Sequence, residues 1–190
     1  MVLATFVASV LIFASCGNPQ RSSDTSKVAQ DRNEERFDDS KQEKDAQFLV
    51  NAAEINMKQI QLGQLAQQKG TSTHVKELGK RMEDTYTKSQ RDLTALAQRK
   101  SITLPTTQTN DVRDAYDKLN KKTGNDFDKA YTDEMISLHE DAIDTFENAT
   151  TDREDAEIKN WAIAVLPEMR TNLNYAIDLQ NRSDRSSSSK

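Results

Sequence analysis

The chain has 190 residues, a formal net charge of −5 at pH 7, and 30% charged against 35% hydrophobic residues. This acidic balance argues against a nucleic-acid partner, because binding to the phosphate backbone depends on clusters of Lys and Arg. The presence of only five Gly and three Pro favours long helices over a turn-rich β fold, and a single Cys excludes a disulfide within the chain.

The N-terminus has the pattern of a bacterial lipoprotein signal peptide. An apolar run from Val2 to Phe13 has the length of a signal-peptide core and is too short to span a bilayer as a helix. Two small residues, Ala14 and Ser15, separate this run from Cys16, the only cysteine. We therefore predict a signal peptide over residues 1–15 and attachment of a lipid to the Cys16 thiol. The mature protein is then anchored to a membrane of the bacterial cell envelope, in the outer membrane or facing the periplasm.

Two features depart from the usual lipoprotein pattern. Phe13 stands three residues before the cysteine, where Leu is commoner, and no Lys or Arg precedes Arg21. A truncated or misassigned start codon would explain the missing positive charge. The alternatives are an ordinary secretory signal with an incidental cysteine, and a buried N-terminal helix.

Two polar segments flank the predicted folded region. Residues 16–40 and 182–190 are rich in Ser, Asp and Arg and contain almost no apolar side chains. Such segments cannot bury enough apolar surface to offset the entropy lost on folding. The sequence therefore predicts a disordered polar tether over 16–40, a disordered Ser-rich tail over 182–190, and one folded domain over 41–181.

The folded region begins with two predicted long helices. Ser40 and Glu43 form a possible capping box that opens a helix over residues 40–69. Gly70 is expected to end this helix as a C-cap, and a second helix is expected over residues 73–99. Apolar residues recur in both at intervals of three and four and form one stripe on each helix. The two stripes are Phe48, Ala52, Ile55, Leu62, Leu65 and Ala66, and Val75, Leu78, Met82, Tyr86, Leu93, Leu96 and Ala97.

An irregular connection separates these helices from the third long helix. Residues 100–110, which include Pro105, form the longest irregular segment, and a short helix is expected over residues 111–121. Gly124 breaks the chain, and Asp126 is expected to cap the third long helix. The apolar stripe of that helix is Phe127, Tyr131, Met135, Leu138, Ala142 and Phe146.

A second capping box, Thr151 with Glu154, is expected to open the fourth long helix, which ends near Asn181. Its stripe is Trp161, Val165, Met169, Leu173 and Ala176. Amphipathic helices of this kind do not persist alone in water, so the four apolar stripes are expected to face one another. The sequence predicts an all-α, up-down four-helix bundle with a short extra helix in the long connection between its second and third helices.

Five short motifs resemble those of a known family. They are Asp45-Ala-Gln-Phe-Leu, Leu62-Gly-Gln-Leu-Ala66, Ile102-Thr-Leu-Pro105, Phe127-Asp-Lys-Ala-Tyr131 and Leu166-Pro167. In this order and spacing the chain resembles the DUF4142 family of bacterial envelope proteins, from about Asp45 to Asn181. The resemblance implies a ferritin-like fold, which agrees with the predicted bundle, and it implies no established biochemical role.

A ferritin-like fold raises the question of a metal site, which needs several carboxylates and imidazoles from different helices. Of the two histidines, His74 lies in the first turn of its helix and is expected to be solvated. His139 follows Met135 by one turn and borders the apolar stripe, so it is the single candidate for an internal metal ligand.

The resemblance also bears on the partners of His139. Members of the resembled family tend to carry Glu at the position of Gln59, and His at the positions of Tyr86 and Asn172. The neutral groups present here are poor metal ligands. We therefore expect no metal site, and a His139 that is hydrogen-bonded to Tyr86, Asn172 or a backbone carbonyl.

No motif for catalysis or for a cofactor is recognised in the sequence, so no catalytic or cofactor-binding residue is assigned. The first hypothesis is a lipid-anchored, non-enzymatic helical module that contacts an envelope protein or a small ligand, with the membrane reached through Cys16. The alternative is a ferritin-like metal-binding or metal-storage protein that uses His139 with Glu54 or Glu134. A third hypothesis is a stress-induced envelope protein whose bundle protects or spaces layers.

Overall fold

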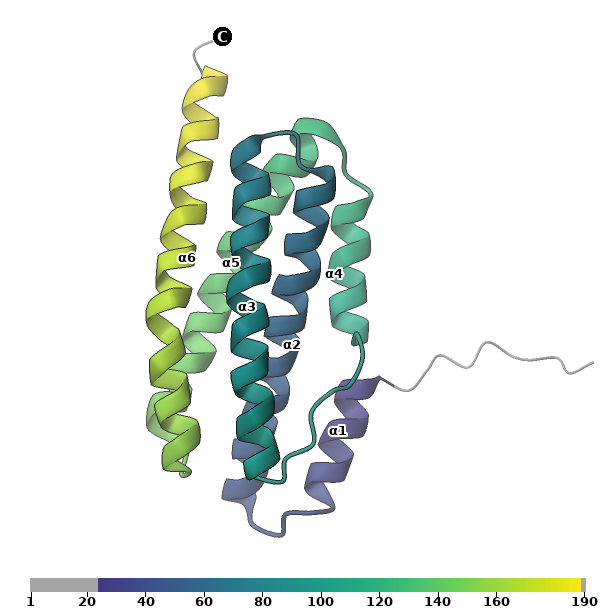
Figure 1. Cartoon of the computed structure of the whole chain (residues 1–190), viewed down its shortest axis with the longest axis vertical. Helices are drawn as coiled ribbons and strands as arrows, with labels where there is room; N and C mark the ends of the chain where they lie inside the picture. Colours follow the sequence, from purple (N-terminus) through teal and green to yellow (C-terminus); the bar gives the residue numbers. More distant parts are fainter. Residues whose placement is uncertain (1–23, 189–190) are drawn as a thin grey trace, which may run out of the picture.

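The computed structural model describes residues 24–188, and all the regular secondary structure in this part of the chain is α-helical (Figure 1). The predicted signal peptide and Cys16 lie outside the described residues. The helices are α1 (Thr25–Glu34), α2 (Ser40–Lys69), α3 (Thr73–Arg99), α4 (Asn110–Asn120), α5 (Gly124–Asp152) and α6 (Ala156–Ser188). The prediction of an all-α fold is confirmed. Between residues 24 and 188, no helix has both the length and the apolar character needed to cross a membrane.

The four long helices lie side by side (Figure 1). α2 packs along α3 and α5 packs along α6, and further contacts join α3 to α6 and α2 to α5. α4 lies along the outer side of α2, and α1 packs on the opposite end of α2. The core lies between the long helices, and its largest fully buried side chains are aromatic: Tyr86, Tyr131, Phe127 and Phe146.

Helices α2 and α3 begin and end at the predicted residues. The predicted capping box of Ser40 with Glu43 is wrong, because the N-cap of α2 is Asp39, whose carboxylate accepts a hydrogen bond from the Lys41 amide (3.0 Å). The predicted C-cap is confirmed, because the Gly70 amide donates to the Ala66 carbonyl (2.9 Å).

Helices α2 and α3 approach closely at a pair of facing glycines. A Cβ atom added to Gly63 would lie 2.5 Å from the Gly79 carbonyl oxygen, and one added to Gly79 would lie 2.6 Å from the Gly63 carbonyl oxygen. Real Cβ atoms do not come this close to backbone oxygens, so glycine at both positions permits the contact between the two helix backbones.

The predicted start of the fourth long helix is wrong. α5 continues through Thr151 to Asp152, and α6 begins at Ala156. The cap is the carboxylate of Asp155, which accepts hydrogen bonds from the amides of Glu157 (2.9 Å) and Ile158 (3.1 Å). The cap predicted for α5 is also wrong, since that helix begins at Gly124, where φ is 58°, and Asp126 lies in its first turn.

The predicted tether over residues 16–40 is wrong for the part that the structure describes, because α1 occupies residues 25–34. Polar contacts, chiefly those between Asn33 and Thr103, attach this helix to the rest of the domain. A prediction based on the hydropathy of the segment does not take such contacts into account. The predicted tail over 182–190 is also wrong up to Ser188, since α6 continues to that residue and extends past the other helices (Figure 1). The ion pair of Asp178 with Arg182, one turn apart, supports this extension.

Candidate functional site

His139 lies inside the molecule, where the four long helices face one another. α5 supplies His139, α3 supplies Tyr86, α2 supplies Gln59 and α6 supplies Asn172. All four side chains are buried, with exposed fractions of 0 or 1%. In the sequence, Tyr86 lies in one apolar stripe and His139 at the border of another, and the structure brings His139 together with Tyr86 and Gln59.

Both ring nitrogens of His139 are hydrogen-bonded. Nδ1 lies 2.6 Å from the Met135 carbonyl oxygen, and Nε2 lies 3.0 Å from the Tyr86 hydroxyl. A carbonyl oxygen only accepts hydrogen bonds, so Nδ1 carries the proton and Nε2 accepts one from Tyr86. The expected bonds to Tyr86 and to a backbone carbonyl are confirmed. Neither nitrogen has a free lone pair, so the imidazole is a hydrogen-bonding group of the core.

Burial keeps this group uncharged. It lowers the pKa of His139 to about 4, and the hydrogen bond to the Met135 carbonyl opposes that shift. Burial also raises the pKa of the Tyr86 and Tyr131 hydroxyls above the ordinary value for tyrosine. At neutral pH the side chains of His139, Tyr86 and Tyr131 are therefore all uncharged.

The Gln59 amide completes the surroundings of His139. Its Nε2 atom lies 3.4 Å from Nδ1 of His139, and its Oε1 atom is buried without a hydrogen-bond partner. Because Nδ1 is a donor, the alternative amide orientation, which exchanges Oε1 and Nε2, directs Oε1 toward Nδ1 and gives Oε1 a donor that it shares with the Met135 carbonyl. Gln59 therefore also contributes a neutral hydrogen bond.

Asn172 is bonded to an arginine that the sequence analysis did not identify. The Arg81 Nε atom donates to the Asn172 Oδ1 atom (2.6 Å), and its Nη2 atom donates to Glu168 (3.1 Å). The guanidinium carbon lies 5.7 Å from the centroid of the Tyr175 ring. A long side chain from the outer part of α3 thus reaches a fully buried amide on α6.

The two carboxylates considered as partners of His139 are engaged elsewhere. Glu54 is hydrogen-bonded to Ser26 and Thr109, and burial raises the pKa of Glu54. Glu134 forms an ion pair with Lys118 of α4 (2.8 Å). The structure therefore does not assemble the predicted alternative ligand set around His139. Across residues 24–188, no group of three or more His, Cys, Asp or Glu side chains is placed to hold a metal ion.

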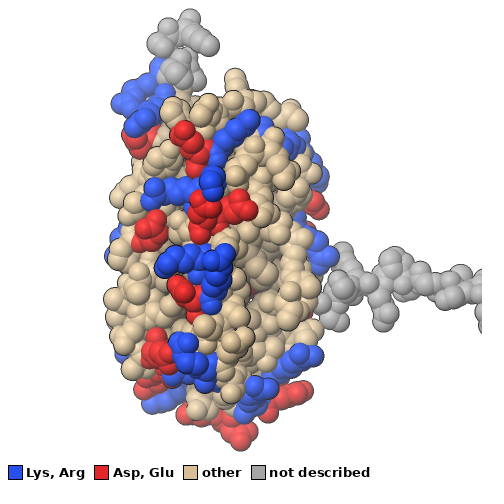
Figure 2. Space-filling view, viewed as in Figure 1, with Lys and Arg blue, Asp and Glu red and all other residues tan. Residues whose placement is uncertain are grey.

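The other histidine lies at the surface, as expected. His74 has a 58% exposed side chain, and its Nδ1 atom lies 3.5 Å from the Glu77 carboxylate. Charges of both signs alternate along the face that α3 and α6 form (Figure 2). Ion pairs between these two helices, such as Arg81 with Glu168 and Arg99 with Glu157, contribute to this pattern.

Comparison with known proteins assigns the chain to a family. The family model described as "Domain of unknown function (DUF4142)" matches residues 30–179, which include everything from the second half of α1 to the packed part of α6. No curated protein and no solved structure matches the chain. The chain belongs to the DUF4142 family.

Proposed function

We propose that this chain is a lipid-anchored protein of the bacterial cell envelope, and that its helical domain is a non-enzymatic interaction module. We also propose that its four long helices form a ferritin-like up-down bundle. The observation that carries the non-enzymatic part of the proposal is the state of His139, which is buried, neutral and hydrogen-bonded through both nitrogens.

A general base or a metal ligand needs a free lone pair within reach of its target. The Nε2 lone pair of His139 is taken up by Tyr86, and the side chain has no exposed surface. His139, the residue that the sequence indicates as best suited to acid–base or metal chemistry, is thus part of the core. This supports a role for the outer surface of the domain, where charges of both signs are arranged in pairs (Figure 2).

The N-terminal sequence supports the anchor. The apolar run that ends at Phe13, the small residues Ala14 and Ser15, and Cys16 match the order that a lipoprotein signal peptide requires. One acyl chain binds a membrane only marginally, whereas several chains on one terminus give stable attachment. Diacylglycerol on the Cys16 thiol would supply two of them.

Metabolic labelling with a radioactive or alkyne-tagged fatty acid tests the anchor. The wild-type protein is expected to incorporate the label and to sediment with membranes. The Cys16→Ser variant lacks the thiol and is expected to remain unlabelled. Equal labelling of the two proteins, or no labelling of either, contradicts the proposal.

A further inference from the structure

Helix α1 is attached to the rest of the domain mainly through polar groups. The side chains that it buries are Ser26, Ala29 and Asn33, which share one face of the helix, and only Ala29 is apolar. A groove of about 210 Å³ lies between α1 and α2. α1 therefore buries far less apolar surface than the long helices do.

Most of these polar contacts reach the irregular connection between α3 and α4. The Asn33 amide forms two hydrogen bonds with the Thr103 backbone: Nδ2 donates to the carbonyl (2.9 Å) and Oδ1 accepts from the amide (2.8 Å). The Thr25 hydroxyl donates to the Thr107 carbonyl (2.9 Å). At the N-terminus of α1, Asp24 accepts a hydrogen bond from the Asn110 amide (3.3 Å).

These contacts make α1 the least firmly held helix of the described chain. A ten-residue helix does not persist alone in water, so α1 is helical only while it is docked. Each hydrogen bond contributes little net stability, because water replaces it when the helix leaves. Such segments open separately from the core and at a lower free energy than global unfolding.

We propose that α1 is a releasable strap that sets the length of the tether between the membrane and the domain. The inference rests on the proposed lipid anchor at Cys16. Seven residues separate Cys16 from Asp24, at the start of the strap, and twenty separate Cys16 from Phe37, which packs on the core beyond it. Release of α1 therefore lengthens the tether without unfolding α2 to α6.

The change in reach follows from chain geometry. With α1 docked, the span from Cys16 to Asp24 is at most about 27 Å, and with α1 released the span from Cys16 to Phe37 is at most about 70 Å. The domain thus has a short-tether state and a long-tether state.

Hydrogen exchange on the lipidated full-length protein in nanodiscs tests the strap. In the wild type, amides of α1 are expected to exchange at least about tenfold faster than amides in the middle of α2 and α3. Asn33→Ala removes both bonds to Thr103 and should raise exchange in α1 by about a further tenfold, with α2 and α3 unchanged. Since Ala is a better helix former than Asn, such an increase cannot result from lower helix propensity.

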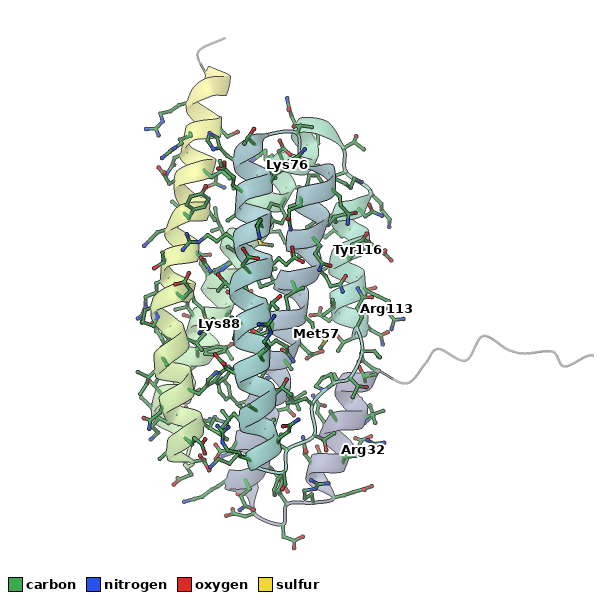
Figure 3. All side chains as sticks on the ribbon, in the orientation of Figure 1. Arg32, Met57, Lys76, Lys88, Arg113 and Tyr116 are labelled. Carbon is green, nitrogen blue, oxygen red and sulfur yellow. The ribbon has the colours of Figure 1, made fainter. Side chains whose placement is uncertain are left out.

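Arg32→Ala is the matched control, because Arg32 is exposed on α1 and lies outside the docking face (Figure 3). It should leave exchange in α1 unchanged. The strap is contradicted if α1 exchanges as slowly as the middle of α2 in the wild type. The strap is also contradicted if Asn33→Ala leaves the exchange rate in α1 unchanged, or if it accelerates exchange throughout the core.

Fluorescence resonance energy transfer between the domain and the membrane reports on the length of the tether. Trp161 is the only tryptophan and serves as the donor to dansyl-labelled lipid in the nanodisc. Transfer is expected to fall in Asn33→Ala and to stay at the wild-type value in Arg32→Ala. If hydrogen exchange shows that α1 is released in Asn33→Ala but energy transfer is unchanged, then release of α1 does not lengthen the tether, and the proposal is overturned. If Cys16 carries no lipid, no protein is retained on the nanodisc, and the proposed anchor is refuted. Hydrogen exchange measured in detergent then still decides whether α1 is releasable.

Discussion

His139 is a histidine in a site that disfavours the doubly protonated, charged form of its ring. Its pKa is about 4 in the folded protein, against 6.5 for an unperturbed histidine, because burial disfavours the imidazolium. Between these two values the unfolded chain binds a proton that the folded chain does not. The free energy of unfolding therefore decreases as the pH falls from 6.5 towards 4, because protonation of His139 favours the unfolded chain.

A pH series measures this effect. Lowering the pH from 7.5 to 4.5 should cost roughly 2.5 kcal/mol of unfolding free energy through His139 alone. Urea unfolding followed by Trp161 fluorescence gives the total change. The His139→Gln variant keeps every carboxylate but lacks the imidazole. The difference between the pH profiles of the two proteins therefore gives the contribution of His139 to the unfolding free energy. Parallel profiles for the two proteins would show that His139 is not held neutral.

The hydroxyl of Tyr86 is predicted to stabilise the fold through its bond to His139. Tyr86→Phe leaves the buried Nε2 atom without a donor and should lower the unfolding free energy by about 1–3 kcal/mol. Tyr116→Phe is the control, since Tyr116 is only half-buried on α4, and its effect should stay within about 0.5 kcal/mol. A similar loss in both variants would contradict the assigned bond.

At the scale of the element, the pair α2 and α3 depends on its two facing glycines. Gly63→Ala adds a methyl group at 2.5 Å from a backbone oxygen of α3, so the helices must move apart. We expect a loss of about 2–4 kcal/mol in urea unfolding, in the range of overpacked and strained core sites, although Ala is the better helix former. Gln68→Ala on the exposed side of α2 should have little effect. A stabilised Gly63→Ala protein would contradict the close approach.

The bounds of α2 and α3 were predictable because local signals define them. Apolar residues recur at helical spacing, and Gly70 ends α2. α1 was not predictable in this way, because its docking depends on Asn33 and on a backbone seventy residues further along the chain. The start of α6 was misplaced because Thr151 and Glu154 match a capping pattern, whereas α5 continues through Thr151 to Asp152 and the Asp155 carboxylate caps α6.

At the scale of the whole molecule, the candidate site was predictable in part. The helical position of His139 and the neutral residues at the facing positions indicated a hydrogen-bonded histidine, and the bond to Tyr86 confirms this. The pairing of Asn172 with Arg81 was not foreseen, because it depends on how a long side chain folds back between helices. Glu54 is hydrogen-bonded to Ser26 of α1 and to Thr109 before α4, and Glu134 forms an ion pair with Lys118 of α4. These polar contacts depend on how the short helices dock, which the apolar spacing of the sequence does not specify.

The central claim is that His139 is a neutral, hydrogen-bonded residue of the core and not a metal ligand, which supports the proposal that the domain acts through its surface. Elemental analysis of protein purified without chelator tests it most directly. We expect iron, manganese, copper and zinc well below one equivalent per chain, with the same values for a folded His139→Gln variant. One or two equivalents of a metal in the wild type, lost in His139→Gln, would contradict the account.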